Sequence, residues 1–302
     1  FDGSGSAEPC FSFGYGGRPA GELLNSWERA FSSRSLDPQR TEHTLLYTDP
    51  ETGLAVRCVA VAYSDYPVVE WTVYLENTGR QNTPVIENLQ ALDVVLAPSG
   101  PGDFVLRGNR GDHNVADSYA PYEMTLWQNT DNAFAPAGGR ACDTAFPYFN
   151  LAKQGGGGII LAIGWPGQWS ARFTHHAGPG LQVTAGQELT RLYLEPGERI
   201  RTPLIALLLW EGSDVVRAQN LWRRWLLAHN LPRPQGQPLR PALCFCDYAF
   251  FGWARNTEEG EKLFIDELTR QGIQLDYWWV DAGWFPRGQG EWMVDRERFP
   301  NG

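Results

Sequence analysis

Two acidic residues near the end of the sequence each follow a short run of apolar and aromatic residues. Asp247 comes after the run Ala242–Cys246, and Asp281 comes after Tyr277–Val280 within the segment DYWWVDAGWFP. A carboxylate in such a position can accept hydrogen bonds from ligand hydroxyl groups. Aromatic rings beside it can stack on the apolar face of a sugar ring. The two aspartates are therefore candidate contacts for a polyhydroxylated ligand.

The elements that must position these aspartates are predicted to be a strand, a helix and a second strand. Ala242–Tyr248 (ALCFCDY) and Gln274–Trp284 are apolar runs of strand type. Between them Asn256, three residues before Glu259, predicts a helix start of capping-box type, and Gly272 predicts the helix end. This order with a short second link predicts parallel strands. Their carboxyl ends then lie at one edge, where barrel enzymes build their sites.

Alternation along the second strand divides its side chains between two faces. Tyr277, Trp279 and Asp281 share one face, and Trp278 falls on the other. One face must point to the domain interior and the other must pack under the helix, so we expect Trp278 and Trp279 to be core residues. Trp284, beyond the strand end, is a candidate platform for a pyranose ring.

The rest of the chain predicts a β domain followed by a helical connection. From about residue 9 to 203, short runs rich in Val, Thr, Tyr and Trp alternate with turn clusters, as in Val68–Leu75 (VVEWTVYL). This pattern predicts a large β-sandwich over residues 1–205. Ser213–Asn230 has apolar residues at helical spacing and Arg233–Pro241 is rich in proline, which predicts a helical linker over residues 206–240.

Residues 241–302 are expected to be the start of a larger α/β domain. A single strand–helix–strand unit cannot cover both faces of its own sheet, so further units should cover the exposed apolar edge. The sequence is accordingly expected to be the N-terminal portion of a longer protein.

Composition limits the partners and the compartment. The 302 residues carry a formal net charge of −10, which argues against nucleic acid or an anionic membrane as a partner. The five cysteines contain no C-x-x-C pair, and Cys244 and Cys246 are expected to be buried free thiols. No leader of signal-peptide type is visible, but the chain starts at Phe1 without methionine. Localisation stays open, with the cytoplasm slightly favoured.

The segment YWWVDAGWFP, followed by GEWMVDRERFPNG, resembles glycoside hydrolase family 36, the α-galactosidase group. Members carry an Asp-Asp-Gly-Trp motif after the second barrel strand and then a Gly-x-Trp segment that ends in Phe-Pro-Asn-Gly. The specific motifs cover about residues 240–302. The predicted architecture of the whole chain is similar to the family's β-supersandwich, helical linker and (β/α)8 TIM barrel.

This resemblance implies hydrolysis of α-linked galactosides with retention, by two carboxylates about 5 Å apart. The family's nucleophile lies on the fourth barrel strand and its acid/base on the sixth, so no catalytic residue is expected in this chain, which alone should be inactive. Asp281 matches the first aspartate of the motif, which accepts hydrogen bonds from the sugar. Ala282 replaces the second aspartate, which leaves another α-linked sugar open. Asp247, with Trp253 in the position of a tryptophan-containing segment, is a further candidate substrate contact.

Two other functions stay open. One is a carbohydrate-binding or scaffold module, and the other is a transglycosylase of raffinose-synthase type. The resemblance implies an α-linked oligosaccharide or glycoside as partner, with no cofactor and no metal. It leaves a homo-oligomer open.

Overall fold

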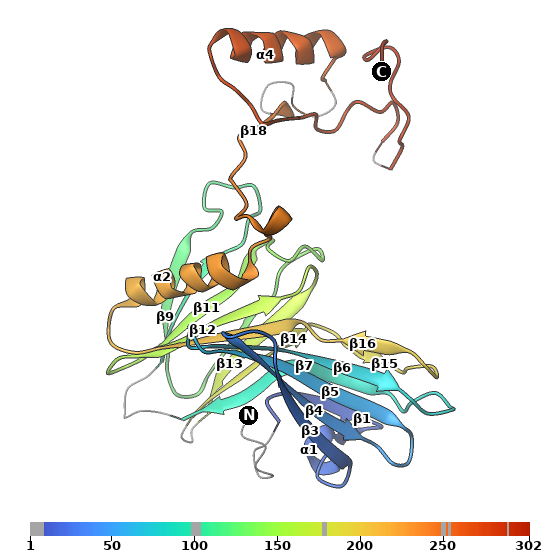
Figure 1. Ribbon diagram of the computed structural model, residues 1–302, viewed down its shortest axis with the longest axis vertical. Helices are drawn as coiled ribbons and strands as arrows, with labels where there is room; N and C mark the ends of the chain where they lie inside the picture. Colours follow the sequence, from blue (N-terminus) through green and yellow to red (C-terminus); the bar gives the residue numbers. More distant parts are fainter. Residues whose placement is uncertain (1–8, 98–103, 177–179, 249–251, 253–254, 289) are drawn as a thin grey trace. The chain divides into compact units, whose positions relative to one another are not determined.

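The computed structural model describes residues 9–97, 104–176, 180–248, 252, 255–288 and 290–302 (Figure 1). The chain divides into two compact units, Phe1–Ala228 and His229–Gly302, which we call the β unit and the C-terminal unit. No helix in the described ranges is long and apolar enough to cross a lipid bilayer.

The larger sheet of the β unit has ten antiparallel strands. Its central strands are long, and burial alternates along them, as in LAVRCVAVAY, where Leu54, Val56, Cys58 and Ala60 are buried and the residues between them are half-buried. In spatial order the strands are β3 (Glu28–Ser35), β4 (Arg40–Thr48), β5 (Leu54–Tyr63), β6 (Val68–Asn77), β17 (Leu204–Trp210), β12 (Gly158–Gly164), β11 (Ala145–Lys153), β8 (Phe104–Arg110) and β9 (Pro121–Leu126), with β16 (Arg199–Arg201) beside β6.

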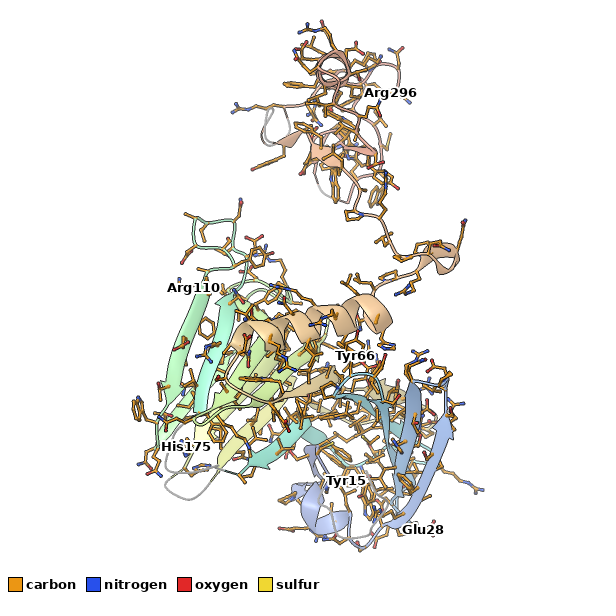
Figure 2. The ribbon with its side chains drawn as sticks, turned by 60° about the vertical axis from the view of Figure 1, so that its left-hand side comes forward. Tyr15, Glu28, Tyr66, Arg110, His175 and Arg296 are labelled. Atoms are coloured by element: carbon orange, nitrogen blue, oxygen red, sulfur yellow. The ribbon has the colours of Figure 1, made fainter. Side chains whose placement is uncertain are left out.

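The second sheet has seven strands and also pairs antiparallel. Its order is β10 (Thr130–Phe134), β13 (Trp169–His175), β14 (Leu181–Gln187), β7 (Ile86–Leu96), β1 (Ser12–Tyr15) and β2 (Arg18–Pro19), with β15 (Arg191–Leu192) beside β7 and the short helix α1 (Ala20–Leu23) after β2. Figure 2 shows Tyr15 and Glu28 at one end of the β unit, and Arg110 and His175 on strands at the other end. The predicted all-β domain is confirmed.

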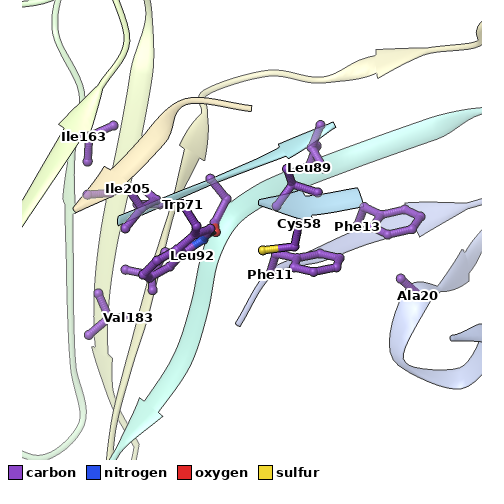
Figure 3. Close-up of a cluster of buried hydrophobic side chains, with 14 of the residues drawn as sticks. Phe11, Phe13, Ala20, Cys58, Trp71, Leu89, Leu92, Ile163, Val183 and Ile205 are labelled. Atoms are coloured by element: carbon purple, nitrogen blue, oxygen red, sulfur yellow. Dashed lines mark hydrogen bonds between the residues drawn. The ribbon is translucent and has the colours of Figure 1, made fainter. Parts of the chain in front are cut away.

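The core lies between the two sheets. Figure 3 shows Trp71 and Ile205 from the larger sheet beside Leu92 and Val183 from the smaller one. The Trp71 indole donates a hydrogen bond of 2.8 Å to the carbonyl of Ala91 in β7. Ala91 lies at a β-bulge, between Gln90 and Leu92, which pair with Gly186 and Ala185 of β14. The indole therefore satisfies a buried acceptor across the core.

One helix covers part of the outer face of the larger sheet. Helix α2 (Val215–Trp225) begins at Asp214, whose carboxylate accepts a hydrogen bond of 2.9 Å from the Arg217 amide. Trp222 and Trp225 on one side of α2 pack in a second apolar cluster that includes Ile160 of β12. Figure 1 shows α2 along β11 and β12. The π-helix η1 (Leu226–Asn230) continues it, as the helical spacing of Ser213–Asn230 predicted.

The C-terminal unit contains one strand–helix–strand motif. Strand β18 (Cys244–Cys246) pairs in parallel with β19 (Tyr277–Trp279), and α4 (Glu258–Arg270) connects them. The single-turn 3-10 helix η2 (Pro234–Gly236) precedes the motif. The predicted parallel pairing is confirmed, and Gly272 has the positive φ of a helix stop, +77°.

Details of the sequence prediction for this unit were wrong. Thr257, not Asn256, caps α4, because the Thr257 hydroxyl accepts a hydrogen bond from the Gly260 amide. The Asn256 side-chain amide instead donates to the Asp247 carboxylate. Trp279, expected in the core, is 61% exposed. Cys244 is exposed and Cys246 half-buried rather than both buried. On the face that carries these side chains, Tyr277 is also 66% exposed.

Replacing Trp71 by Phe should destabilise the β unit by about 1–3 kcal/mol, because the buried Ala91 carbonyl would lose the indole donor. Urea unfolding followed by circular dichroism measures the change. Trp127→Phe is the matched control, since Trp127 is 61% exposed and its substitution should shift stability by less than about 0.5 kcal/mol. Equal effects of the two substitutions would refute the cross-sheet role of Trp71.

Candidate functional site

The two predicted aspartates lie together at the carboxyl ends of β18 and β19. The Asp247 amide donates to the Trp279 carbonyl at 3.2 Å, which extends the parallel ladder by one residue. The Asp281 amide then donates to the Asp247 carboxylate at 2.8 Å. Parallel pairing thus places both residues at one edge of the sheet, as the strand order predicted.

Asp247 is buried and bound by protein groups. The residue is only 2% exposed. One carboxylate oxygen accepts from the Asp281 amide, and the other accepts from the Asn256 side-chain amide at 2.9 Å. This arrangement favours a role in holding the ends of the two strands and the start of α4 over direct contact with a ligand.

Asp281 is the more accessible of the two carboxylates. It is half-buried, and one oxygen accepts from the Ala282 amide at 2.5 Å. The other lies 3.5 Å from the thiol sulfur of Cys246, which is a weak donor. A carboxylate oxygen has two lone pairs, so Asp281 keeps acceptor capacity for hydroxyl groups of a ligand.

A third acid, Glu261 of α4, belongs to this cluster although we did not predict it. Glu261 is 6% exposed, and the Trp278 indole donates to its carboxyl oxygen Oε2 at 2.7 Å. Burial, and then contact with the Asp247 carboxyl, raises the pKa of Glu261 to about 7. Its other oxygen, Oε1, and the Asn256 Oδ1 have no hydrogen-bond partner among the described residues. A proton on Glu261 supplies the donor that this acceptor-rich cluster lacks.

The sequence carried a signal for Glu261. Phe264 and Leu268, three and seven residues later, lie on the same face of α4 and are partly buried. A carboxyl residue in an inward-facing helical stripe is unusual, since buried acids need a partner. The spacing indicates burial but not which group compensates it.

Trp284 lies in the loop after β19 and is half-buried. Its ring lies 6.0 Å from that of Trp292, centroid to centroid, and its carbonyl accepts from the Asp295 amide at 2.7 Å. Asp295 also binds the Arg298 guanidinium at 2.9 Å, which lowers the pKa of the Asp295 carboxyl. The loop therefore fixes the backbone of Trp284 through local hydrogen bonds. Trp253, the remaining predicted contact, lies outside the described residues.

The Phe-Pro-Asn-Gly end of the loop binds the first turn of α4. Asn301 donates through its backbone and side-chain amides to the Glu258 carboxylate at 3.0–3.1 Å. Lys262 and Asn301 together lower the pKa of Glu258 to about 2. The Glu258 amide in turn donates to the Arg298 carbonyl at 2.9 Å. This segment thus fastens the end of the loop to the first turn of α4.

Comparison with models of known protein families and with curated protein sequences finds no match. Several solved structures are similar. The α-galactosidase AgaA of Geobacillus stearothermophilus, a GH36 enzyme crystallised as a substituted variant with stachyose, has a TM-score of 0.72 and 16% identity over 98% of this chain and 43% of its own. The α-galactosidase of Lactobacillus brevis gives 0.73 and 13%, over 98% and 42%. The galactosidase domain of the α-galactosidase–sucrose kinase AgaSK gives 0.75 and 16%, over 98% and 43%.

The chain therefore has the fold of the N-terminal portion of GH36 α-galactosidases. The predicted resemblance is confirmed at that level. Identities of 13–16% establish shared fold only. The chain spans about 43% of the length of these structures, so the activity of the whole protein is a matter for proposal.

Glu261 generates a pH-dependent stability that can be measured. Its folded pKa of about 7 lies above the ordinary value of 4.5, so the contribution of Glu261 is fully present below pH 4.5 and is lost as the pH rises through 7. Urea unfolding of the C-terminal unit, followed by tryptophan fluorescence between these pH values, should show this loss. Glu261→Gln, which stays neutral, should abolish that part of the pH dependence.

Glu259→Gln is the matched control, because Glu259 is exposed on the same helix. It should leave the pH profile unchanged. A Glu261→Gln profile that falls with pH as steeply as the parent profile would contradict the raised pKa of Glu261.

Proposed function

We propose that the chain is the N-terminal portion of a retaining glycoside hydrolase that acts on α-linked galactosides or related α-glycosides. Within it, residues 1–205 form a β-supersandwich, residues 206–240 form a helical linker, and residues 241–302 begin a (β/α)8 barrel. The share of this chain in the reaction is sugar binding, because the resemblance assigns the two reacting carboxylates to later barrel strands. Alone, the chain binds without cleaving.

The observation that carries the proposal is the position of Asp281. It is a partly exposed carboxylate with free acceptor capacity, at the carboxyl end of a parallel strand. Its backbone is held by the buried Asp247, so its position is fixed before a ligand arrives. The GH36 structures of similar fold include complexes described with stachyose and with raffinose, both α-linked oligosaccharides. These facts favour a sugar hydroxyl as the group that donates a hydrogen bond to Asp281.

The other candidate contacts have different roles in this proposal. Trp284 provides an aromatic face for the pyranose ring, and Trp253, which lies outside the described residues, stays a candidate sugar contact. Asp247 acts through Asp281, as a positioning residue. Ala282 offers no acceptor where the family motif has an aspartate, and a missing acceptor reduces discrimination between sugar epimers. The sugar is therefore an α-linked pyranose that includes galactose without being restricted to it.

The proposed barrel also explains an exposed apolar surface on the C-terminal unit. Tyr277 and Trp279 on β19 are 66% and 61% exposed, and Leu243 and Leu263 are 52% and 66% exposed. A two-stranded parallel sheet with such faces requires cover from further strands and helices. In a closed barrel, neighbouring units supply that cover.

Activity of the protein encoded by the complete reading frame tests the function. It should hydrolyse p-nitrophenyl α-galactoside, and Asp281→Asn should lower kcat/KM about 10- to 100-fold, as expected for loss of a hydrogen bond to a charged group. Asp276→Asn is the matched control, since Asp276 lies at the opposite end of the same strand and binds Arg240 at 2.7 Å. It should change kcat/KM less than about twofold.

The products separate the remaining alternatives. Free galactose from raffinose supports the hydrolase, whereas galactose transferred to a second sugar with little free galactose identifies a transglycosylase. Binding of raffinose without any turnover by the complete protein identifies a carbohydrate-binding or scaffold module. Full activity in Asp281→Asn would refute the role of Asp281.

The 302-residue chain alone should self-associate, because the exposed apolar face of its C-terminal unit is left without cover. Sedimentation velocity over a range of concentrations measures this. Tyr277→Ser together with Trp279→Ser should reduce the association, whereas Trp127→Ser in the β unit should not. A monodisperse, cooperatively folded monomer would contradict the proposal that this α/β motif requires further barrel units.

A further inference from the structure

The β unit contains a cavity of about 660 Å³ on the outer face of its larger sheet. Strands β8, β9 and β11 form the floor, and helix α2 borders it. Figure 1 shows α2 along this part of the sheet. The volume lies within the roughly 300–1,000 Å³ of small-molecule sites. Neither the strand packing nor the candidate site around Asp281 accounts for this cavity.

Three aromatic rings form one wall of the cavity. Phe146 and Tyr148 of β11 lie 5.0 Å apart, and Trp222 of α2 lies 5.8 Å from Tyr148, centroid to centroid. Tyr148 is 36% exposed, whereas Trp222 is 8% exposed and packs against Trp225 behind it. The wall therefore presents a ring that is held in place by buried neighbours and is open to a ligand.

Hydrogen-bond donors and acceptors lie around the aromatic wall. Arg107 of β8 donates to the Glu123 carboxylate of β9 at 2.6 Å, and Gln219 of α2 also lines the cavity. Asn150 of β11, 7% exposed, accepts from the Trp210 indole at 3.1 Å through Oδ1. Its Nδ2 has no hydrogen-bond partner among the described residues. A buried amide with an unused donor at the edge of a cavity is costly unless a ligand or water completes it.

These lining groups fit a hydroxylated ring. Arg107 is paired with Glu123, and Arg223 of α2, which also lines the cavity, donates to the neutral Asn220 side chain at 3.0 Å, so the lining offers two guanidinium donors and one carboxylate acceptor. An apolar ligand would leave the polar groups unpaired. A pyranose has an apolar ring face for Tyr148 and hydroxyl groups that both donate to Glu123 and accept from Arg107.

We propose that this cavity is a second, non-catalytic saccharide-binding site, which takes a pyranose unit of a neutral oligosaccharide against Tyr148. It is independent of the site around Asp281, since every lining residue belongs to the β unit. Such a site would retain a polymeric or oligomeric substrate on the protein without taking part in bond cleavage.

Saturation-transfer difference NMR on the 302-residue chain tests the proposal, because the method detects binding with a Kd of about 1 mM and tolerates self-association. Raffinose and maltotriose, each at about 10 mM, are the probes. Ring protons of at least one of them should receive saturation. Tyr148→Ala should reduce the part of the signal that remains in Asp281→Asn at least about tenfold. Tyr193→Ala is the matched control, since Tyr193 is 51% exposed outside the cavity, and it should not change the signal.

Two further variants make every outcome decisive. Glu123→Gln, in a side chain that is 60% exposed, tests the polar rim without disturbing the core and should weaken binding several-fold. The same measurements in an Asp281→Asn background, which weakens sugar binding at the site of the proposed function, should retain a signal that depends on Tyr148. No transfer to either sugar overturns the inference. A signal lost in Asp281→Asn but retained in Tyr148→Ala also overturns it, while supporting the proposed function of the Asp281 site.

Discussion

The buried carboxylate of Asp247 is the interaction on which the C-terminal unit depends. It joins three segments that are distant in sequence: its own strand β18, the Asp281 backbone beyond β19, and Asn256 before α4. Each bond goes to an oxygen of a residue that is 2% exposed, where competing water is largely excluded. Two short strands of three residues each could not fix the position of Asp281 by ladder hydrogen bonds alone.

Burying the Asp247 carboxylate beside a second acid, Glu261, has an electrostatic cost. Two ionised carboxylates in contact inside a protein repel, so one of them keeps its proton. Asp247 accepts two hydrogen bonds from amide donors. Glu261 has a single indole donor and the raised pKa, so it is the partner that holds the proton. This division leaves Asp281, outside the pair, as the carboxylate open to a ligand.

Alternation and helical spacing were sufficient to predict most of the architecture. The two-residue period of Val68–Leu75, which lies within β6, predicted a strand of the β unit, and Gly272 marked the end of α4. Local pattern could not assign Asn256, because Asn256 and the neighbouring Thr257 are both good caps and the tertiary contact with Asp247 decided between them. The prediction that Trp279 is a core residue was wrong for a related reason, because an aromatic strand residue is buried only where another surface packs against it.

Exposed aromatic residues in the two units have different meanings, and their surroundings distinguish them. Tyr277 and Trp279 lie on a short strand face among exposed apolar residues, which is the pattern of a surface that other protein segments cover. Tyr148 instead lies in a cavity with a charged pair and an amide whose donor is unused. Covering protein would bury those polar groups at a cost, whereas a hydroxylated ligand satisfies them. The same residue type thus indicates assembly in one unit and ligand binding in the other.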